Sequence, residues 1–112
     1  MKIYHNPRCG KSRQTLGLIT ESGVEPEIVL YMKDALTVEE LSETINLLGI
    51  KPEALLRKKE SIFKENFAGK SLTDAEWIQV MVEHPKLMER PIVIKGDKAI
   101  IGRPPENVLS LL

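Results

Sequence analysis

The only cysteine of the chain, Cys9, lies where a predicted strand ends and a predicted helix begins. The segment Lys2–His5 predicts a short strand, and the apolar spacing over Ser12–Ser22 predicts a helix that ends at Gly23. A cysteine at such a turn lies near unpaired backbone N–H groups and the positive end of the helix dipole, which favour the thiolate. We therefore predict that Cys9 is a nucleophile with a pKa below the ordinary value of about 8.5.

The neighbours of Cys9 support a reactive thiol over a structural one. A lone cysteine is often a buried core residue, but here the cations Arg8, Lys11 and Arg13 surround it in the sequence. In the two-cysteine redox motif Cys-x-x-Cys, the second cysteine resolves the disulfide that the first one forms. Ser12 stands at that second position. A disulfide formed by Cys9 must therefore be resolved by a thiol from another molecule.

The other motifs and histidines of the chain predict neither a phosphate-binding loop nor a metal site. Gly10-Lys11-Ser12 looks like the end of a phosphate-binding loop, but His5 stands where that motif needs its first glycine. His5 itself has two interpretations, a strand-end residue bonded to the backbone or a partner that favours the thiolate. His84 is most simply a helix-end residue, and two histidines with one cysteine predict no metal site.

Three arginines occupy positions that are unusual for solvated surface residues. Arg57 ends an apolar run, Arg90 precedes Pro91, and Arg103 precedes two further prolines. The bond before Pro91 is a possible cis peptide. Guanidinium groups bind tetrahedral oxyanions through paired hydrogen bonds. A thiolate beside such groups would suit attack on a phosphate-like oxyanion.

The remaining elements predict the scaffold that positions these residues. A second strand, Glu27–Tyr31, completes a βαβ unit and should run parallel to the first. Helices are predicted to begin after the capping residues Thr37 and Thr73, with a short helical segment at Pro52 between them. We predict a loop with at most one helical turn over 58–70 and a brief helical turn over 86–89.

The last part of the chain predicts a β-hairpin and a terminal helix. Apolar runs over 91–94 and 99–101 flank Gly96-Asp97, which favours a hairpin turn. An α-helix over 106–112 is expected to bury Val108, Leu109 and Leu112. This order of elements predicts an α/β thioredoxin-like mixed sheet: βαβ, a helical insertion, a β-hairpin and a terminal α-helix. We expect one domain over 1–112 with the insertion at about 36–89, and in this fold Arg90 would lie near Cys9.

Composition restricts the classes of function. The chain has 112 residues, 42% of them hydrophobic, which suits one globular domain. Its 16 basic and 16 acidic residues cancel, and with 4% aromatic residues there is no sign of nucleic-acid binding. No apolar run approaches the roughly 20 residues that span a membrane, and no signal peptide is evident. A single cysteine favours the cytoplasm.

Taken together, the motifs of this chain resemble those of the glutaredoxin-dependent arsenate reductases. The segments that carry the resemblance are Tyr4-His5-Asn6-Pro7-Arg8-Cys9-Gly10-Lys11-Ser12-Arg13, Leu55-Leu56-Arg57-Lys58, His84-Pro85, Glu89-Arg90-Pro91-Ile92-Val93 and Ile101-Gly102-Arg103-Pro104-Pro105. They occur in family order and span nearly the whole chain. The resemblance implies a thioredoxin-like fold with a helical insertion.

The resemblance also implies a reaction and its participants. A cysteine thiolate attacks arsenate, glutathione adds as co-substrate, arsenic is reduced to arsenite, and glutaredoxin clears the mixed disulfide. No tightly bound cofactor, nucleic acid or membrane is implied. Carried onto this chain, the catalytic residues are Cys9, His5 and Ser12, the substrate-binding residues are Arg57, Arg90 and Arg103, and Arg90-Pro91 is a cis-proline junction.

Two alternatives remain open from the sequence. A glutathione-linked thiol oxidoreductase on another substrate would use Cys9 equally well but leaves Arg57 and Arg103 without a role. A non-catalytic redox-sensing regulator of the same superfamily would bind a protein partner. Such regulators commonly carry Cys-x-x-Cys, and Ser12 argues against this alternative.

Overall fold

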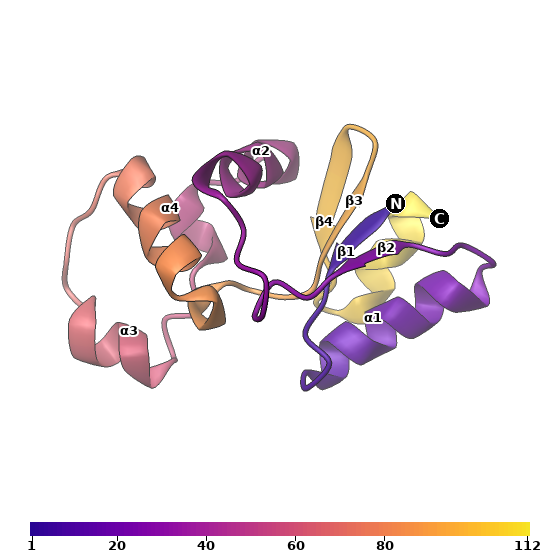
Figure 1. Ribbon diagram of the computed structural model, residues 1–112, viewed down its shortest axis with the longest axis horizontal. Helices are drawn as coiled ribbons and strands as arrows, with labels where there is room; N and C mark the ends of the chain where they lie inside the picture. Colours follow the sequence, from indigo (N-terminus) through magenta and orange to yellow (C-terminus); the bar gives the residue numbers. More distant parts are fainter. The chain divides into compact units, whose positions relative to one another are not determined.

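A four-stranded mixed sheet is assembled from both ends of the chain (Figure 1). The computed structural model describes all residues, 1–112. The strands are β1 (Lys2–Tyr4), β2 (Glu27–Val29), β3 (Ile92–Lys95) and β4 (Lys98–Ile101), in the order β2-β1-β3-β4. β1 is parallel to β2 and antiparallel to β3, and β3 is antiparallel to β4. The parallel βαβ pair and the C-terminal hairpin are confirmed.

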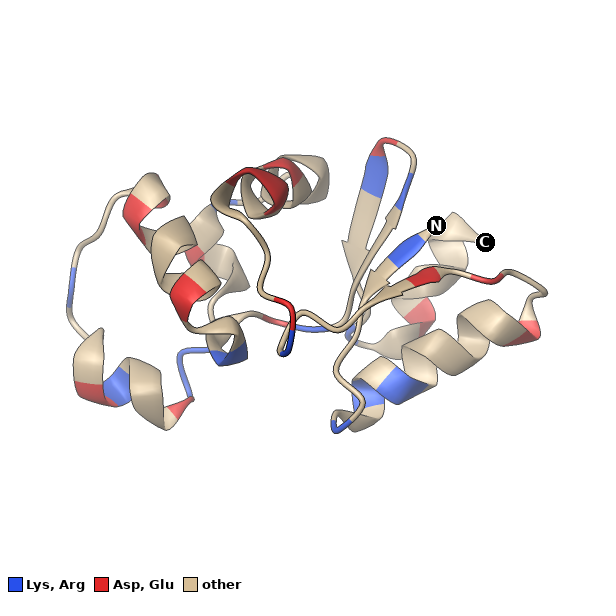
Figure 2. Cartoon of the chain, in the orientation of Figure 1, with Lys and Arg blue, Asp and Glu red and all other residues tan.

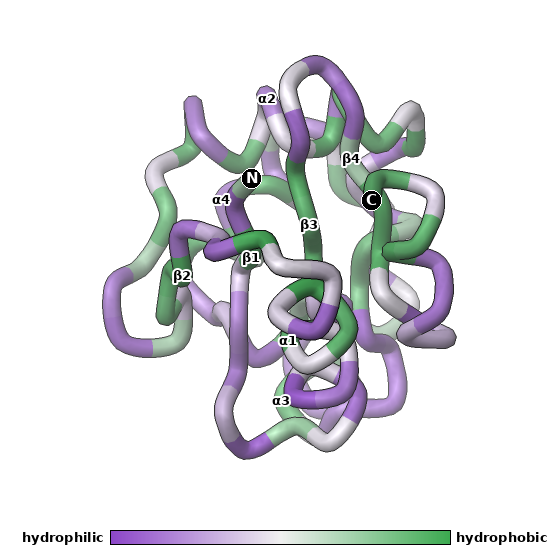
Figure 3. The backbone as a smooth tube through the Cα atoms, turned by 90° about the vertical axis from the view of Figure 1, so that its right-hand side faces the viewer, coloured by the Kyte–Doolittle hydropathy of each residue, from purple (hydrophilic) through white to green (hydrophobic).

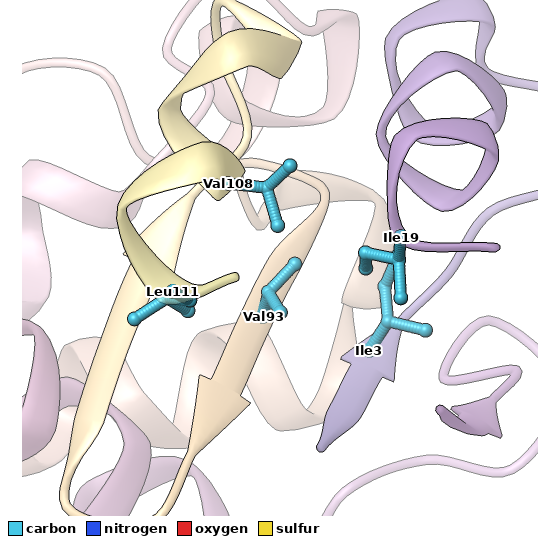
Figure 4. Packing of buried hydrophobic residues seen from close by; sticks show 5 residues of the cluster. All are labelled: Ile3, Ile19, Val93, Val108 and Leu111. Carbon is cyan, nitrogen blue, oxygen red and sulfur yellow. The ribbon is translucent and has the colours of Figure 1, made fainter. Parts of the chain in front are cut away.

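Two helical elements belong to the sheet and supply its core. They are α1 (Gly10–Glu21) and the 3-10 helix η3 (Pro105–Leu111). Figure 4 shows the buried cluster that joins them to the strands, made of Ile3, Ile19, Val93, Val108 and Leu111. The hydrophobic colouring along β3 in Figure 3 marks the strand that contributes Val93 at the centre of this cluster. This sheet unit comprises Met1–Asp34 and Arg90–Leu112.

The terminal helix differs from the predicted α-helix in its period. A 3-10 helix has three residues per turn, so residues three apart share one face. Pro105, Val108 and Leu111 are accordingly buried. Leu109 and Leu112, which we expected in the core, are 53% and 40% exposed. The α-helical period was the wrong assumption for this segment.

Two boundaries near the cysteine also differ from those predicted. α1 begins at Gly10 instead of Ser12, which makes Cys9 its N-cap residue, and Gly23 follows its end with a φ of 88°. β2 ends at Val29 and does not reach Tyr31. The chain turns there because the carbonyl oxygen of Leu30 accepts hydrogen bonds from the N–H groups at positions 33 and 34.

Residues Ala35–Glu89 form a second, helical unit. Its elements are α2 (Val38–Leu48), η1 (Pro52–Leu55), α3 (Ser61–Asn66), α4 (Asp74–Glu83) and η2 (Pro85–Leu87). Both predicted capping boxes are present, Thr37 with Glu40 and Thr73 with Glu76, so the predicted starts of α2 and α4 are confirmed. None of the helices of the chain has the length and apolarity required to cross a bilayer.

The segment 58–70 contains a helix that the sequence did not predict. α3 lacks a side-chain N-cap, and its six residues carry little periodic signal. The ring of Phe63 is buried and stacks on Trp77 of α4 with centroids 6.0 Å apart, and Phe67 packs against both rings. Contacts with a distant helix therefore stabilise α3, and these contacts are invisible to a local pattern.

Candidate active site

Cys9 lies at the N-terminus of α1 in the geometry of a helix cap. Its backbone is extended (φ −97°, ψ 121°), and its carbonyl accepts the N–H of Arg13 at 3.0 Å. Its own N–H donates to the carbonyl of Asn6 at 3.0 Å, which closes a tight turn over residues 6–9. The side chain is only 8% exposed. The turn and the helix start thus hold the thiol at a fixed position near the surface.

The electrostatics around the thiol favour the thiolate. Burial raises the pKa of Cys9, but the backbone N–H of Ser12, the positive charge of Arg90, the N–H of Lys11 and the Arg90 N–H groups together lower it below its usual value. The sulfur does not make a regular helix-capping hydrogen bond. We attribute the lowered pKa to amide dipoles and a guanidinium that lie close enough to stabilise negative charge. The direction of this pKa shift agrees with the one predicted for Cys9.

The cation responsible is not one of the three that neighbour Cys9 in the sequence. Arg8, Lys11 and Arg13 have exposed side chains, and the blue segments at the start of α1 in Figure 2 mark the last two. Arg13 donates from Nη1 to the carbonyl of Pro7 at 2.8 Å and so braces the loop. Because exposed charges are screened by water, the partly buried Arg90 has the larger effect on Cys9.

His5 and Ser12 form a buried hydrogen-bonded pair beneath the loop. Ser12 Oγ lies 2.6 Å from His5 Nδ1 and accepts the backbone N–H of Asn6 at 3.0 Å. Burial, together with the charge of Arg13, lowers the pKa of His5 below 6.5, so the ring is neutral at pH 7. The buried Ser12 hydroxyl needs an acceptor for its proton, and Nδ1 is the one within reach. This assigns the proton of the neutral ring to Nε2.

These contacts separate two functions of Ser12. Its hydroxyl is occupied by His5 and Asn6, whereas its backbone N–H lowers the pKa of Cys9. The ring of His5 bonds to a side-chain hydroxyl and not to the backbone, and its main-chain N–H donates to Val29 of β2 at 2.9 Å. His5 and Ser12 thus fix the end of β1 against the start of α1.

Arg90 enters the site from the start of β3. The Arg90-Pro91 peptide bond is cis, as is Arg103-Pro104. The Nε and Nη1 groups of Arg90 are buried and have no hydrogen-bond partner within the protein. Burial of these two donors without a partner carries a desolvation cost, which an anion bound beside Cys9 would offset.

Arg103 lies at the same end of the hairpin as Arg90. The register that pairs Ile92 with Ile101 continues through a 2.8 Å hydrogen bond from the N–H of Gly102 to the carbonyl of Pro91. The residues that follow this bond on each strand are the two arginines. The side chain of Arg103 is exposed.

Gly102 is a positioning residue that the sequence did not indicate. A Cβ atom there would lie 2.6 Å from Thr15 Oγ1 and 2.8 Å from Pro91 Cγ. Thr15 is itself fully buried in α1, where its hydroxyl donates to the carbonyls of Lys11 and Gly102. The absence of a side chain lets the hairpin approach both α1 and the proline beside Arg90. In the sequence, the only feature that could have indicated a special role for Gly102 is its position directly before Arg103-Pro104-Pro105.

Arg57 belongs to the helical unit and has a partner there. Its Nη1 lies 2.7 Å from Glu60 Oε1, and the other oxygen of that carboxylate lies 3.7 Å from Lys86 Nζ. The backbone N–H of Arg57 donates to the carbonyl of Leu87 at 2.7 Å. The structure therefore groups His5, Cys9, Ser12 and Arg90 in one unit, and Arg57 in the other.

The arrangement in the sheet unit suits nucleophilic attack on an anion. It combines a stabilised thiolate, a guanidinium whose Nε and Nη1 groups have no protein partner, and a neutral His5 that pairs with Ser12 and fixes the loop. No group of three or more His, Cys, Asp or Glu side chains is placed to hold a metal ion.

The sequence is similar to one protein family over nearly its whole length. The ArsC family profile matches residues 4–111. The chain is 52% identical to the uncharacterised protein YfgD of Escherichia coli K12, over 100% of this chain and 96% of that protein. It is 46% identical to an arsenate reductase of Haemophilus influenzae, over 98% and 97% of the two chains.

The solved structures extend this likeness to the fold. The structure of an arsenate reductase from Vibrio cholerae superposes with a TM-score of 0.95 at 45% identity, covering 99% of this chain and 96% of the other. The predicted thioredoxin-like α/β fold is thereby confirmed.

Proposed function

Because the chain belongs to the ArsC family, we propose that it is an arsenate reductase whose nucleophile is the Cys9 thiolate. The observation that carries the proposal is the pairing of that thiol with Arg90, whose buried Nε and Nη1 groups have no partner within the protein. A tetrahedral oxyanion would use these donors and would bring its central atom to the sulfur.

The reaction begins with formation of a sulfur–arsenic bond. The Cys9 thiolate adds to arsenate, and one arsenate oxygen is protonated and leaves as water. The thiol of glutathione displaces a second oxygen as water. Arsenic then accepts two electrons and passes from As(V) to As(III), while the two sulfurs leave it as a disulfide between Cys9 and glutathione. Glutaredoxin reduces this disulfide and regenerates the Cys9 thiolate.

Each remaining residue has a separate role in this proposal. Arg90 and Arg103 bind the oxyanion and its reduced adduct, while the binding role expected of Arg57 stays a prediction, since Arg57 belongs to the helical unit. His5 and Ser12 hold the loop so that the amides at the start of α1 face the sulfur. Because the chain contains a single cysteine, the thiol that pairs with Cys9 and the thiol that later reduces their disulfide both come from other molecules, with no tightly bound cofactor. A glutathione-rich reducing compartment such as the cytoplasm would supply them.

One observation favours a second candidate. Arg57 is paired with Glu60, so its guanidinium is less available for an oxyanion than that of Arg90. A glutathione-linked thiol oxidoreductase acting on another substrate would need Cys9 and Arg90 but not Arg57.

The test is arsenite formation by the purified protein given arsenate, glutathione and glutaredoxin. We expect turnover that disappears when glutaredoxin is omitted and in Cys9→Ser, whose circular dichroism spectrum should match that of the parent. Lys98→Gln, an exposed charge change on β4, is the matched control and should keep full turnover. Undiminished activity in Cys9→Ser would refute the mechanism. Reduction of a mixed glutathione disulfide without arsenate turnover would establish the second candidate instead.

A further inference from the structure

A pocket of about 350 Å³ opens in the sheet unit beside the loop that carries the thiol. Residues 5–8 form one wall, and Leu30, Met32 and Lys33 form the other. Its volume falls in the range of about 300–1,000 Å³ that is typical of small-molecule sites. Arg90, whose donors we assign to the oxyanion, is not among the residues that line the pocket, so we consider a different occupant for it.

The wall of the pocket and the nucleophile belong to the same turn. The carbonyl of Asn6 accepts the N–H of Cys9 at 3.0 Å, and its Oδ1 accepts the N–H of Arg8 at 3.1 Å. Both bonds fix the loop 6–9 between the pocket and the start of α1. Asn6, which lines the pocket, is thus hydrogen-bonded directly to the backbone of Cys9.

The lining has a distinct chemistry. Leu30 and Met32 are 36% and 44% exposed, so both offer apolar surface to a molecule in the pocket. Arg8 and Lys33 add two cations, and none of the residues that line the pocket is acidic. Such a site suits a molecule of peptide size with anionic ends and an apolar middle. A small tetrahedral oxyanion would leave the apolar surface unused.

We propose that this pocket binds glutathione, the thiol co-substrate, and holds its sulfur ready for the adduct on Cys9. Glutathione carries two carboxylates, which complement Arg8 and Lys33, and a central cysteine whose methylene and sulfur can pack on Leu30 and Met32. The inference rests on the proposed function, because that function requires a second thiol at Cys9. It adds a location for the thiol and the residues that select it.

The binding test uses Cys9→Ser protein and S-methylglutathione, a pair that cannot form a disulfide. Titration calorimetry gives the dissociation constant, and amide chemical shifts locate the ligand. We expect shifts at residues 5–8 and 30–33. In that background Lys33→Gln and Arg8→Gln should each weaken binding about two- to fivefold, the typical contribution of an exposed ion pair. Met32→Gln should also weaken it, whereas Lys98→Gln, on β4, should not.

The outcomes separate this inference from the proposed function. Equal affinity in Lys33→Gln, Arg8→Gln and the parent would overturn the pocket assignment, as would shifts confined to other parts of the chain or no binding at millimolar ligand. If arsenate turnover with glutathione persists in that case, the proposed function stands and the pocket alone is wrong. If binding behaves as expected but arsenate is not reduced, the pocket assignment stands and the proposed reaction fails.

Discussion

Replacement of Gly102 by alanine tests whether the hairpin positions the active site. The added Cβ would lie 2.6 Å and 3.0 Å from two side-chain atoms of Thr15 and 2.8 Å from Pro91 Cγ. Ordinary contact begins near 3.4 Å, so these groups must separate by about 0.8 Å. Thr15 is fully buried and hydrogen-bonded within α1, and Pro91 is ring-constrained, so neither can turn aside.

The magnitude follows from the cost of overpacking a buried contact. Insertion of a methyl group into a packed interior costs about 1–3 kcal/mol. Alanine also lowers the conformational entropy of the unfolded chain relative to glycine, which stabilises the folded state by about 0.4–1 kcal/mol. We therefore expect Gly102→Ala to lower the free energy of unfolding by about 1–2 kcal/mol, which corresponds to a Tm lower by roughly 4–8 °C for each kcal/mol.

The assay combines unfolding with a probe of the thiol. Urea denaturation followed by circular dichroism gives the stability, and the rate of Cys9 alkylation against pH reports its pKa. Because displacement of Pro91 moves the adjoining Arg90, the alkylation midpoint of Gly102→Ala should shift to higher pH. Gly17→Ala is the matched control, since nothing lies within 4 Å of its added Cβ and alanine favours the helix.

A double-mutant cycle makes the test more specific. Two of the three close contacts involve Thr15, so Gly102→Ala should cost less in a Thr15→Ala background than in the parent. The reasoning is refuted if Gly102→Ala unfolds at the same urea concentration as Gly17→Ala. It is also refuted if the changes in unfolding free energy caused by Gly102→Ala and Thr15→Ala are additive, because the clash would then involve other residues.

Two further predictions concern charge. Arg90→Gln should move the alkylation midpoint of Cys9 to higher pH, because the charge of Arg90 lowers the Cys9 pKa; Arg13→Gln should not, and equal midpoints in both variants would contradict the assignment. The buried neutral ring of His5 should make the fold less stable as the pH falls below about 6.5, because the unfolded chain then takes up a proton that the folded chain does not. Urea midpoints at pH 7.5 and 5.5 measure this loss, and an unchanged difference between them in His5→Gln would show that another group is responsible.

The elements that the sequence predicted well are those whose signals are local. Thr37 and Thr73 bond to backbone and side-chain groups only three residues away, so their capping boxes can be identified without a tertiary structure. Gly49, with a φ of 68°, ends α2 for an equally local reason. The βαβ unit and the hairpin follow from apolar runs separated by clear turns.

The elements that it missed depend on contacts between distant residues. α3 is held by the packing of Phe63 on Trp77, which no window of sequence around α3 contains. The terminal segment has leucines that fit either an α-helical or a 3-10 period, and packing against α1 and β3 selects Val108 and Leu111. For α3 the alternatives were helix and loop, and for the terminal segment they were 3-10 helix and α-helix. In both cases contacts between distant residues, and not the local sequence, selected the structure that forms.

The same distinction applies to the active site. The helix start around Cys9 was predictable, because the strand, the turn and the helix follow one another along the chain. The cation that affects it was predictable only through the fold, since Arg90 is far away in the sequence and reaches the thiol from the segment just before β3. Gly102 could not be identified, because its importance lies in the approach of Thr15 and Pro91 from two other segments.

The surroundings of Ser12 bear on the external thiol that the proposed mechanism requires. It occupies the position of the resolving cysteine in two-cysteine motifs, but its hydroxyl is fully buried and committed to His5 and Asn6. A thiol in its place would be a weak hydrogen-bond partner and would loosen the loop that holds Cys9. With Cys9 only 8% exposed, an incoming thiol must also approach along a restricted path. Residues 5–8 of the same turn line the pocket that we propose for glutathione, so the loop that the Ser12 hydroxyl holds in place would also form part of that site.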